Sequence, residues 1–193
     1  MFANCEYRGL DPKVACIKLD IYGGMRRLMK YLVDKGHKRF AFISSARFNI
    51  EKGFDRDTQN SRYLGFIDSL DLYGLLGEAY RIGSVTDIDE AKNIIDQIIE
   101  RKDITAIVTG NDAIAFMIID ELQNRGLRVP DDIAVTGFDN VRFSQIFRPN
   151  LTTVDLHIDR MSKTVMEIML KALRDEPYEH VSWECDINLG DSA

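Results

Sequence analysis

Two hydrophobic patterns alternate along the chain. Short apolar runs predict strands at 14–17, 39–45, 79–84, 105–109 and 133–136. Longer segments with apolar residues every three or four positions predict amphipathic helices at 22–35, 59–73, 112–124 and 157–174, and one that opens at Asp87. Residues 151–156 look extended, and 181–189 alternate like an edge strand. This order predicts an α/β fold built on a doubly wound parallel sheet.

Local signals sharpen two of these boundaries. Asn111 is a good N-cap for the helix at 112–124, and Gly126 followed by Pro130 predicts its end. Residues 47–58 are polar and have no period. A loop of this length within a compact domain is often functional.

Composition argues against direct contact with nucleic acid or a membrane. The 193 residues carry a net charge of −6, and the basic residues are dispersed. We therefore expect no DNA binding by this chain alone. No apolar run approaches the roughly 18 residues of a membrane span, and the first residues lack the order of a signal peptide. The three cysteines show no metal-binding spacing, which favours reduced thiols and a cytoplasmic location.

Glycines and small polar side chains gather where the predicted strands end. Gly110 to Asp112 follows one strand, and Gly137 to Asp139 follows another. Ligands of open α/β sheets bind at these carboxyl ends. An amide such as Asn111 and a carboxylate such as Asp139 form the paired hydrogen bonds that vicinal sugar hydroxyls require. Each also has a structural interpretation, with Asn111 as a helix cap, Asp139 as a turn residue and Phe138 as part of the core.

Enzyme signatures are absent from the sequence. It contains no GxSxG, HExxH, Walker A or strand-linked GxGxxG motif. His37, His157 and His180 have no partners at a spacing that suggests a catalytic triad. We therefore expect no catalytic residue, no metal site and no cofactor. The interpretation of the chain as a doubly wound enzyme would require a nucleophile or a cofactor-binding loop, and we find neither in the sequence.

Five segments resemble transcription regulators of the lactose-repressor (LacI/GalR) family and occur in that family's order. They are GHKRFAFI (36–43), RYLGF (62–66), TAIV followed by GNDAIA (105–115), GLRVPDDIAVTGFD (126–139) and PNLTTV (149–154). The segments span nearly all of residues 14–189, and their combination is highly specific.

The resemblance implies a type I periplasmic-binding-protein-like fold, in which an effector lies in a cleft between two α/β subdomains. It implies a complete second subdomain (38–148 and 178–190) and a remnant of the first (1–36 and 149–176). The positions that match the family's ligand contacts are Arg62, Asn111 and Asp139. An arginine near a helix start is otherwise most often a surface residue. Val85 stands where many members carry an aromatic stacking residue, which argues against stacking on a sugar face there.

The function implied by the resemblance is that of an effector-sensing domain. The effector would be a sugar or related polyol, with a nucleobase as the second choice. The family's DNA-binding domain and the N-terminal part of the first subdomain are missing, so a homodimer would contact DNA only through the missing domain. The alternative is an extracytoplasmic sugar-binding protein of a transport system, which shares the fold. The three unpaired cysteines and the regulator-type sequence at 126–139 argue against it.

The helices at 22–35 and 157–174 each carry a wide apolar stripe. In the family such stripes pack on first-subdomain strands, most of which are absent from this chain. We therefore expect the chain to self-associate through apolar side chains that would otherwise stay exposed, namely Met25, Leu28, Met29, Leu32, Ile158, Met161, Val165, Ile168 and Met169.

Overall fold

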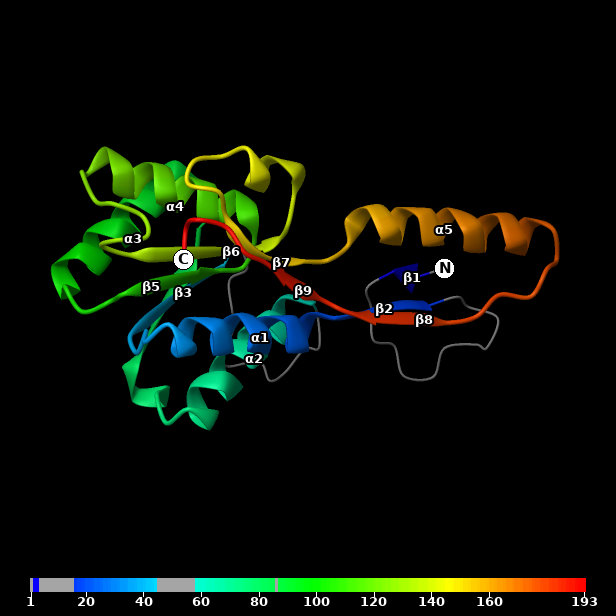
Figure 1. Cartoon of the computed structure of the whole chain (residues 1–193), viewed down its shortest axis with the longest axis horizontal. Helices are drawn as coiled ribbons and strands as arrows, with labels where there is room; N and C mark the ends of the chain where they lie inside the picture. Colours follow the sequence, from blue (N-terminus) through cyan, green and yellow to red (C-terminus); the bar gives the residue numbers. More distant parts are fainter. Residues whose placement is uncertain (1, 4–15, 45–57, 86) are drawn as a thin grey trace.

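A computed structural model of the chain describes residues 2–3, 16–44, 58–85 and 87–193. These residues form a larger and a smaller lobe, and each lobe is built on its own sheet (Figure 1). The predicted loop at 47–58 lies almost entirely outside the described residues, as does the start of the strand predicted at 14–17. The predicted α/β class and parallel sheet are confirmed.

The larger lobe is a doubly wound sheet with strand order β4-β3-β5-β6-β7-β9 among the described residues. The first five strands run parallel, and only the edge strand β9 is antiparallel, against β7. Their bounds are β3 (Phe40–Ser44), β4 (Ala79–Ser84), β5 (Ala106–Thr109), β6 (Ala134–Asp139), β7 (Thr152–Asp155) and β9 (Asp186–Asn188).

Helices cover both faces of this sheet because successive residues of a buried strand point to opposite sides. Phe40 and Phe42 pack with helices α1 (Ile21–Asp34) and α2 (Thr58–Leu72). Ala41 and Ile43 pack with α3 (Ile88–Arg101) and α4 (Asp112–Asn124) on the other face. Gly65 allows close approach of the two helices on the first face, since a Cβ there would lie 2.8 Å from the Tyr22 carbonyl oxygen.

The smaller lobe contains strands β1 (Phe2–Ala3), β2 (Cys16–Asp20) and β8 (Val181–Glu184), all parallel, with helix α5 (Ile158–Leu173) lying over them (Figure 1). Ile168 of α5 and Trp183 of β8 belong to the same buried cluster. The Arg160 guanidinium lies 4.7 Å from the centre of the Trp183 ring, so the helix also holds this strand through a cation–π contact.

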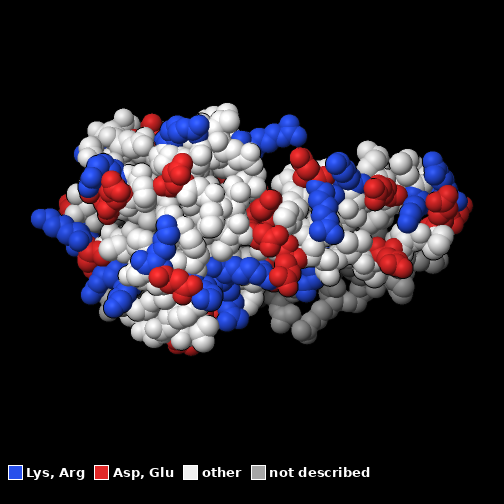
Figure 2. All heavy atoms as spheres, viewed as in Figure 1, with Lys and Arg blue, Asp and Glu red and all other residues white. Residues whose placement is uncertain are grey.

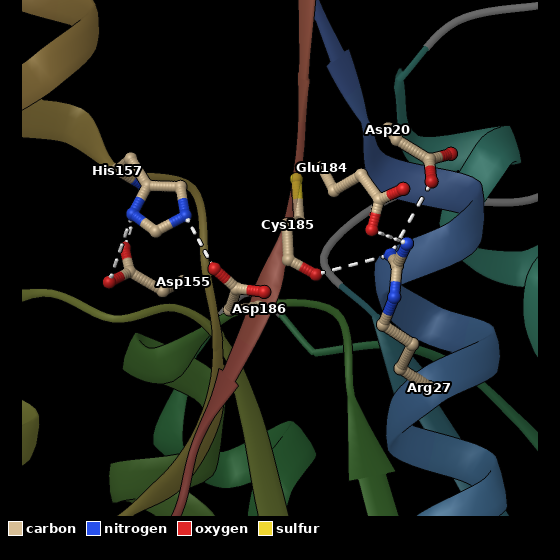
Figure 3. A network of polar contacts seen from close by, with 7 residues as sticks. All are labelled: Asp20, Arg27, Asp155, His157, Glu184, Cys185 and Asp186. Carbon is tan, nitrogen blue, oxygen red and sulfur yellow. Dashed lines mark hydrogen bonds and ion pairs between the residues drawn. The ribbon is translucent and has the colours of Figure 1, made fainter.

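The described chain passes between the lobes at three places, and polar contacts join them (Figure 3). These places are β2 to α1, β7 to α5, and β8 to β9. Arg27 of α1 donates to Asp20 at 3.4 Å and to the Cys185 carbonyl oxygen at 3.3 Å, and it also pairs with Glu184. His157 Nε2 lies 3.2 Å from Asp186 Oδ2. Polar contacts therefore connect the β8-to-β9 passage with each of the other two passages.

Two features differ from the sequence-based expectation. The tail at 181–189 is not one edge strand: it splits at Cys185 into β8, in the small sheet, and β9, in the large one. The apolar stripe of α1 (Met25, Leu28, Met29 and Leu32) is fully buried against the larger lobe, although residues 1–36 were expected with the first subdomain. The α1 stripe is therefore covered within the chain and cannot be a surface for the expected self-association. In the α5 stripe Ile168 is buried as well, and Met161 and Val165 pack against the same cluster. The predicted subdomain boundaries themselves stay a prediction.

Candidate functional site

Arg62 and Asp139 form a partly buried ion pair at the carboxyl edge of the large sheet. Arg62 lies on the second turn of α2, and only 6% of it is exposed. Its Nη2 atom is 2.9 Å from Asp139 Oδ1, and its guanidinium lies 4.5 Å from the centre of the Phe138 ring. A buried charge needs such a partner because desolvation is costly. The interpretation of Arg62 as a surface residue is therefore wrong.

Asp139 ends strand β6 and keeps part of its carboxylate accessible. Its side chain is 26% exposed, and its φ of 117° lies in a region that L-residues rarely adopt. Burial raises the pKa of Asp139 to about 6, although the Arg62 guanidinium acts to lower it. Asp139 pairs in register with Asp155, after which the chain passes to the smaller lobe. The ion pair therefore lies beside the end of the strand from which the chain passes to the smaller lobe.

Asn111 follows β5 at the same edge, one strand away from Asp139. Its Oδ1 accepts a hydrogen bond of 2.9 Å from the Ile114 N–H, which is the N-cap of α4 predicted from the sequence. The cap engages only the carbonyl side of the amide, so the NH₂ group is not needed for it. Arg62 and Asp139 are in direct contact, whereas Asn111 is placed beside them by the sheet. Their role as ligand contacts stays a prediction.

Two apolar residues at this edge belong to the core. The Phe138 ring is fully buried beneath Arg62, which supports its structural interpretation rather than that of a stacking platform. Val85 is also buried, and its N–H donates to the Ser44 carbonyl oxygen at 2.8 Å. Neither side chain offers an exposed face for stacking.

Asp112 is a site residue that sequence reasoning missed. It is fully buried, accepts hydrogen bonds from the Thr153 hydroxyl (2.5 Å) and the Val141 N–H (2.8 Å), and lies behind the Asp139 turn. Burial and, to a smaller extent, the Asp139 charge raise the pKa of Asp112 to about 7, against the lowering effect of the hydrogen bonds that it accepts. Its position among the predicted strand-end residues 110–112 was a signal, but nothing in the sequence indicated that its side chain is buried.

Within the described residues, no group of His, Cys, Asp and Glu side chains could hold a metal ion. Among the same residues, no helix has both the length and the apolar character needed to cross a membrane.

The arrangement defines a class: a doubly wound ligand-binding lobe joined to a second lobe by several chain passages. Residues 29–192 match the family model of the periplasmic binding protein-like domain, and the chain belongs to that family. It is similar to the HTH-type transcriptional repressor PurR of Vibrio atlanticus (32% identity over 152 residues, 78% of this chain and 43% of the relative). The PurR repressor of Aliivibrio fischeri is 31% identical over 159 residues, which are 80% of this chain and 45% of that relative.

Solved structures give the same result. A LacI-type regulator from Bifidobacterium animalis subsp. lactis superposes with a TM-score of 0.75 at 26% identity, covering 93% of this chain and 67% of that one. A LacI-family regulator from Enterococcus faecium, solved with bound ribose, gives 0.80 at 19% identity, covering 96% and 67%. The resemblance to LacI/GalR regulators is thus confirmed, and these relatives are regulators rather than enzymes or transport proteins. The chain spans less than half the length of the curated relatives it matches.

Proposed function

We propose that this chain is the effector-sensing part of a cytoplasmic transcription regulator and binds a small polyhydroxylated molecule at the Arg62–Asp139 edge. The observation that carries the proposal is the partly buried ion pair at the carboxyl ends of the strands, beside the point where β7 passes to the smaller lobe. A ligand held there would contact groups next to the junction and bias the angle between the lobes. DNA would be bound by a domain outside this chain.

The chemistry of the edge favours hydroxyl groups over a flat base. Arg62 supplies donors, Asp139 supplies acceptors, and the Asn111 NH₂ group adds a donor one strand away, which suits neighbouring hydroxyls. Phe138 and Val85 are buried, so neither supports stacking of an aromatic ring. A sugar or polyol is the first candidate and a nucleobase the second. The ribose in the Enterococcus faecium structure makes D-ribose the first probe.

The proposal includes a homodimer, and an aromatic patch on the larger lobe is one of two exposed apolar surfaces that could form it, the other being helix α5. The rings of Phe116, Phe143 and Phe147 contact one another with centroids 4.8–5.7 Å apart. Phe143 is 50% exposed, and the neighbouring Ile146 is 67% exposed. Exposed apolar patches of this kind mark association surfaces.

The first prediction tests the binding edge. Calorimetric titration of D-ribose, D-galactose, glycerol and adenine into the wild-type chain should identify at least one ligand. Asp139→Asn should weaken that affinity about 10- to 100-fold, because a charged acceptor is lost. Asp132→Asn is the matched control, since Asp132 pairs with Arg128 on an exposed surface at 2.8 Å. No binding by the wild type, or equal binding by Asp139→Asn, would contradict the proposal.

A further inference from the structure

Asp139 sits in a turn that is unfavourable in isolation. Asp139 and Asn140 follow each other with φ angles of 117° and 52°, and neither residue is glycine. Such conformations persist where the surroundings over-determine them, and they cluster at binding sites. Something in the structure must therefore hold the turn.

Two buried side chains from other elements hold it. Asp112, at the start of α4, accepts a hydrogen bond of 2.8 Å from the Val141 N–H. Thr153 of β7 accepts one of 3.3 Å from the Asn140 N–H and donates its hydroxyl to Asp112 at 2.5 Å. Both side chains are fully buried. The two backbone N–H groups after Asp139 are thus fixed by one linked pair.

The neighbouring strand makes room for this pair. A Cβ atom at Gly137 would lie 2.2 Å from Asp112 Oδ1, so only glycine allows the carboxylate to sit against β6. Burial raises the pKa of Asp112 to about 7, which means that the fold accommodates a carboxyl group in an unfavourable environment. Groups placed in this way are frequent at functional sites.

We propose that Asp112 and Thr153 are positioning residues: they fix the turn that presents the Asp139 carboxylate to Arg62 and to the effector. Neither needs to touch the effector. The inference rests on the proposed function for the effector, but the positioning of Asp139 can be tested without any ligand.

The test compares Thr153→Val, which removes the hydroxyl, with Thr153→Ser, which keeps it. Thr136→Val is the matched control, because Thr136 is also fully buried, yet its hydroxyl faces the Ile107 carbonyl oxygen rather than the turn. In the full chain, Thr153→Val should speed amide exchange at Asn140 and Val141 about tenfold while the Val108 amide stays protected. It should also move the carbon-13 titration midpoint of Asp139 by about half a unit toward its ordinary value.

Affinity for D-ribose, or for whichever probe binds the wild type, should fall about tenfold in Thr153→Val and return to within about threefold in Thr153→Ser. Unchanged exchange and titration in Thr153→Val, an equal effect of Thr136→Val, or no rescue by serine would overturn the inference. If exchange and titration change as expected but no probe binds the wild type, the positioning pair stands and the proposed effector site fails.

Discussion

At the scale of single residues, a buried and a partly buried carboxyl group dominate the candidate site and have different partners. Asp139 is paired with a guanidinium, whereas Asp112 is contacted by a hydroxyl and a backbone N–H. Burial raises the pKa of both groups, to about 6 and about 7 respectively. Because both values exceed the roughly 3.9 of an unfolded aspartate, the folded state binds protons more tightly than the unfolded one.

This difference predicts a pH dependence of stability. The contribution of Asp112 is fully present below about pH 4 and is lost as the pH rises through about 7, up to about 4 kcal/mol for three pKa units. In Asp112→Asn the free energy of unfolding should decrease less as the pH rises. Measured by urea unfolding, the stability of the variant relative to the wild type should therefore increase between pH 4.5 and pH 8. Asp132, whose pKa is lowered to about 2, acts in the opposite direction but below this window. Parallel stability curves for Asp112→Asn and the wild type would refute this assignment.

At the scale of elements, Asn111 combines a structural and a candidate binding role. Its Oδ1 caps α4, as Asp87 caps α3. Both caps could be predicted because capping is local: a short polar side chain precedes an apolar period. The positions of strands and helices could also be predicted, because their hydrophobic periods are likewise local sequence patterns.

The elements that were not predicted depend on partners far away in the sequence. The tail splits at Cys185 because β8 pairs with β2 and β9 with β7, and alternation alone cannot choose between two sheets. Likewise, the apolar stripe of α1 predicts that one face of the helix is buried, but it does not indicate which lobe covers that face. Asp112 was missed because its burial arises from the convergence of β6 and β7 on the start of α4.

Substitutions at Asn111 should separate its two roles. Asn111→Asp keeps a capping oxygen, so the free energy of unfolding should stay close to that of the wild type. It removes the amide donor and should weaken binding of the identified probe about tenfold. Asn111→Ala should lose about 1 kcal/mol of stability, as should Asp87→Ala, a cap remote from the ion pair. If Asn111→Asp binds the probe as well as the wild type, Asn111 is a cap and no more.

At the scale of the whole molecule, two lobes meet at a polar junction, and acidic and basic side chains are mixed over the face that Figure 2 shows. Arg27 and His157 bridge the passages between the lobes (Figure 3). Asp139 of the Arg62–Asp139 pair lies in register with Asp155, at the end of β7, from which the chain passes to the smaller lobe. Under the proposed function, occupancy of the edge would be coupled to the angle between the lobes, because a ligand that prefers one angle shifts the equilibrium toward it. Both lobes also expose large apolar side chains.

Among the described residues of the smaller lobe, the exposed large apolar side chains lie on helix α5. Its residue Leu173 is 80% exposed and Met166 is 55% exposed. Burial of one large apolar side chain stabilises an assembly by about 1.5–3 kcal/mol, so this face favours self-association. Light scattering should find a species larger than a 22.1 kDa monomer. The double variant Met166→Lys with Leu173→Lys should shift it toward the monomer, because lysine charges resist burial.

Two controls decide which surface is used. Leu72→Lys changes an equally exposed apolar residue at the end of α2 and should leave the assembly intact. Ile146→Lys changes the aromatic patch of the larger lobe instead. If Ile146→Lys gives a monomer and the α5 variant does not, the chain pairs through the larger lobe and the expectation for α5 is wrong. A wild-type chain that stays monomeric at high concentration would exclude both surfaces as sites of self-association. It would show that neither surface buries enough apolar area to offset the entropy of association.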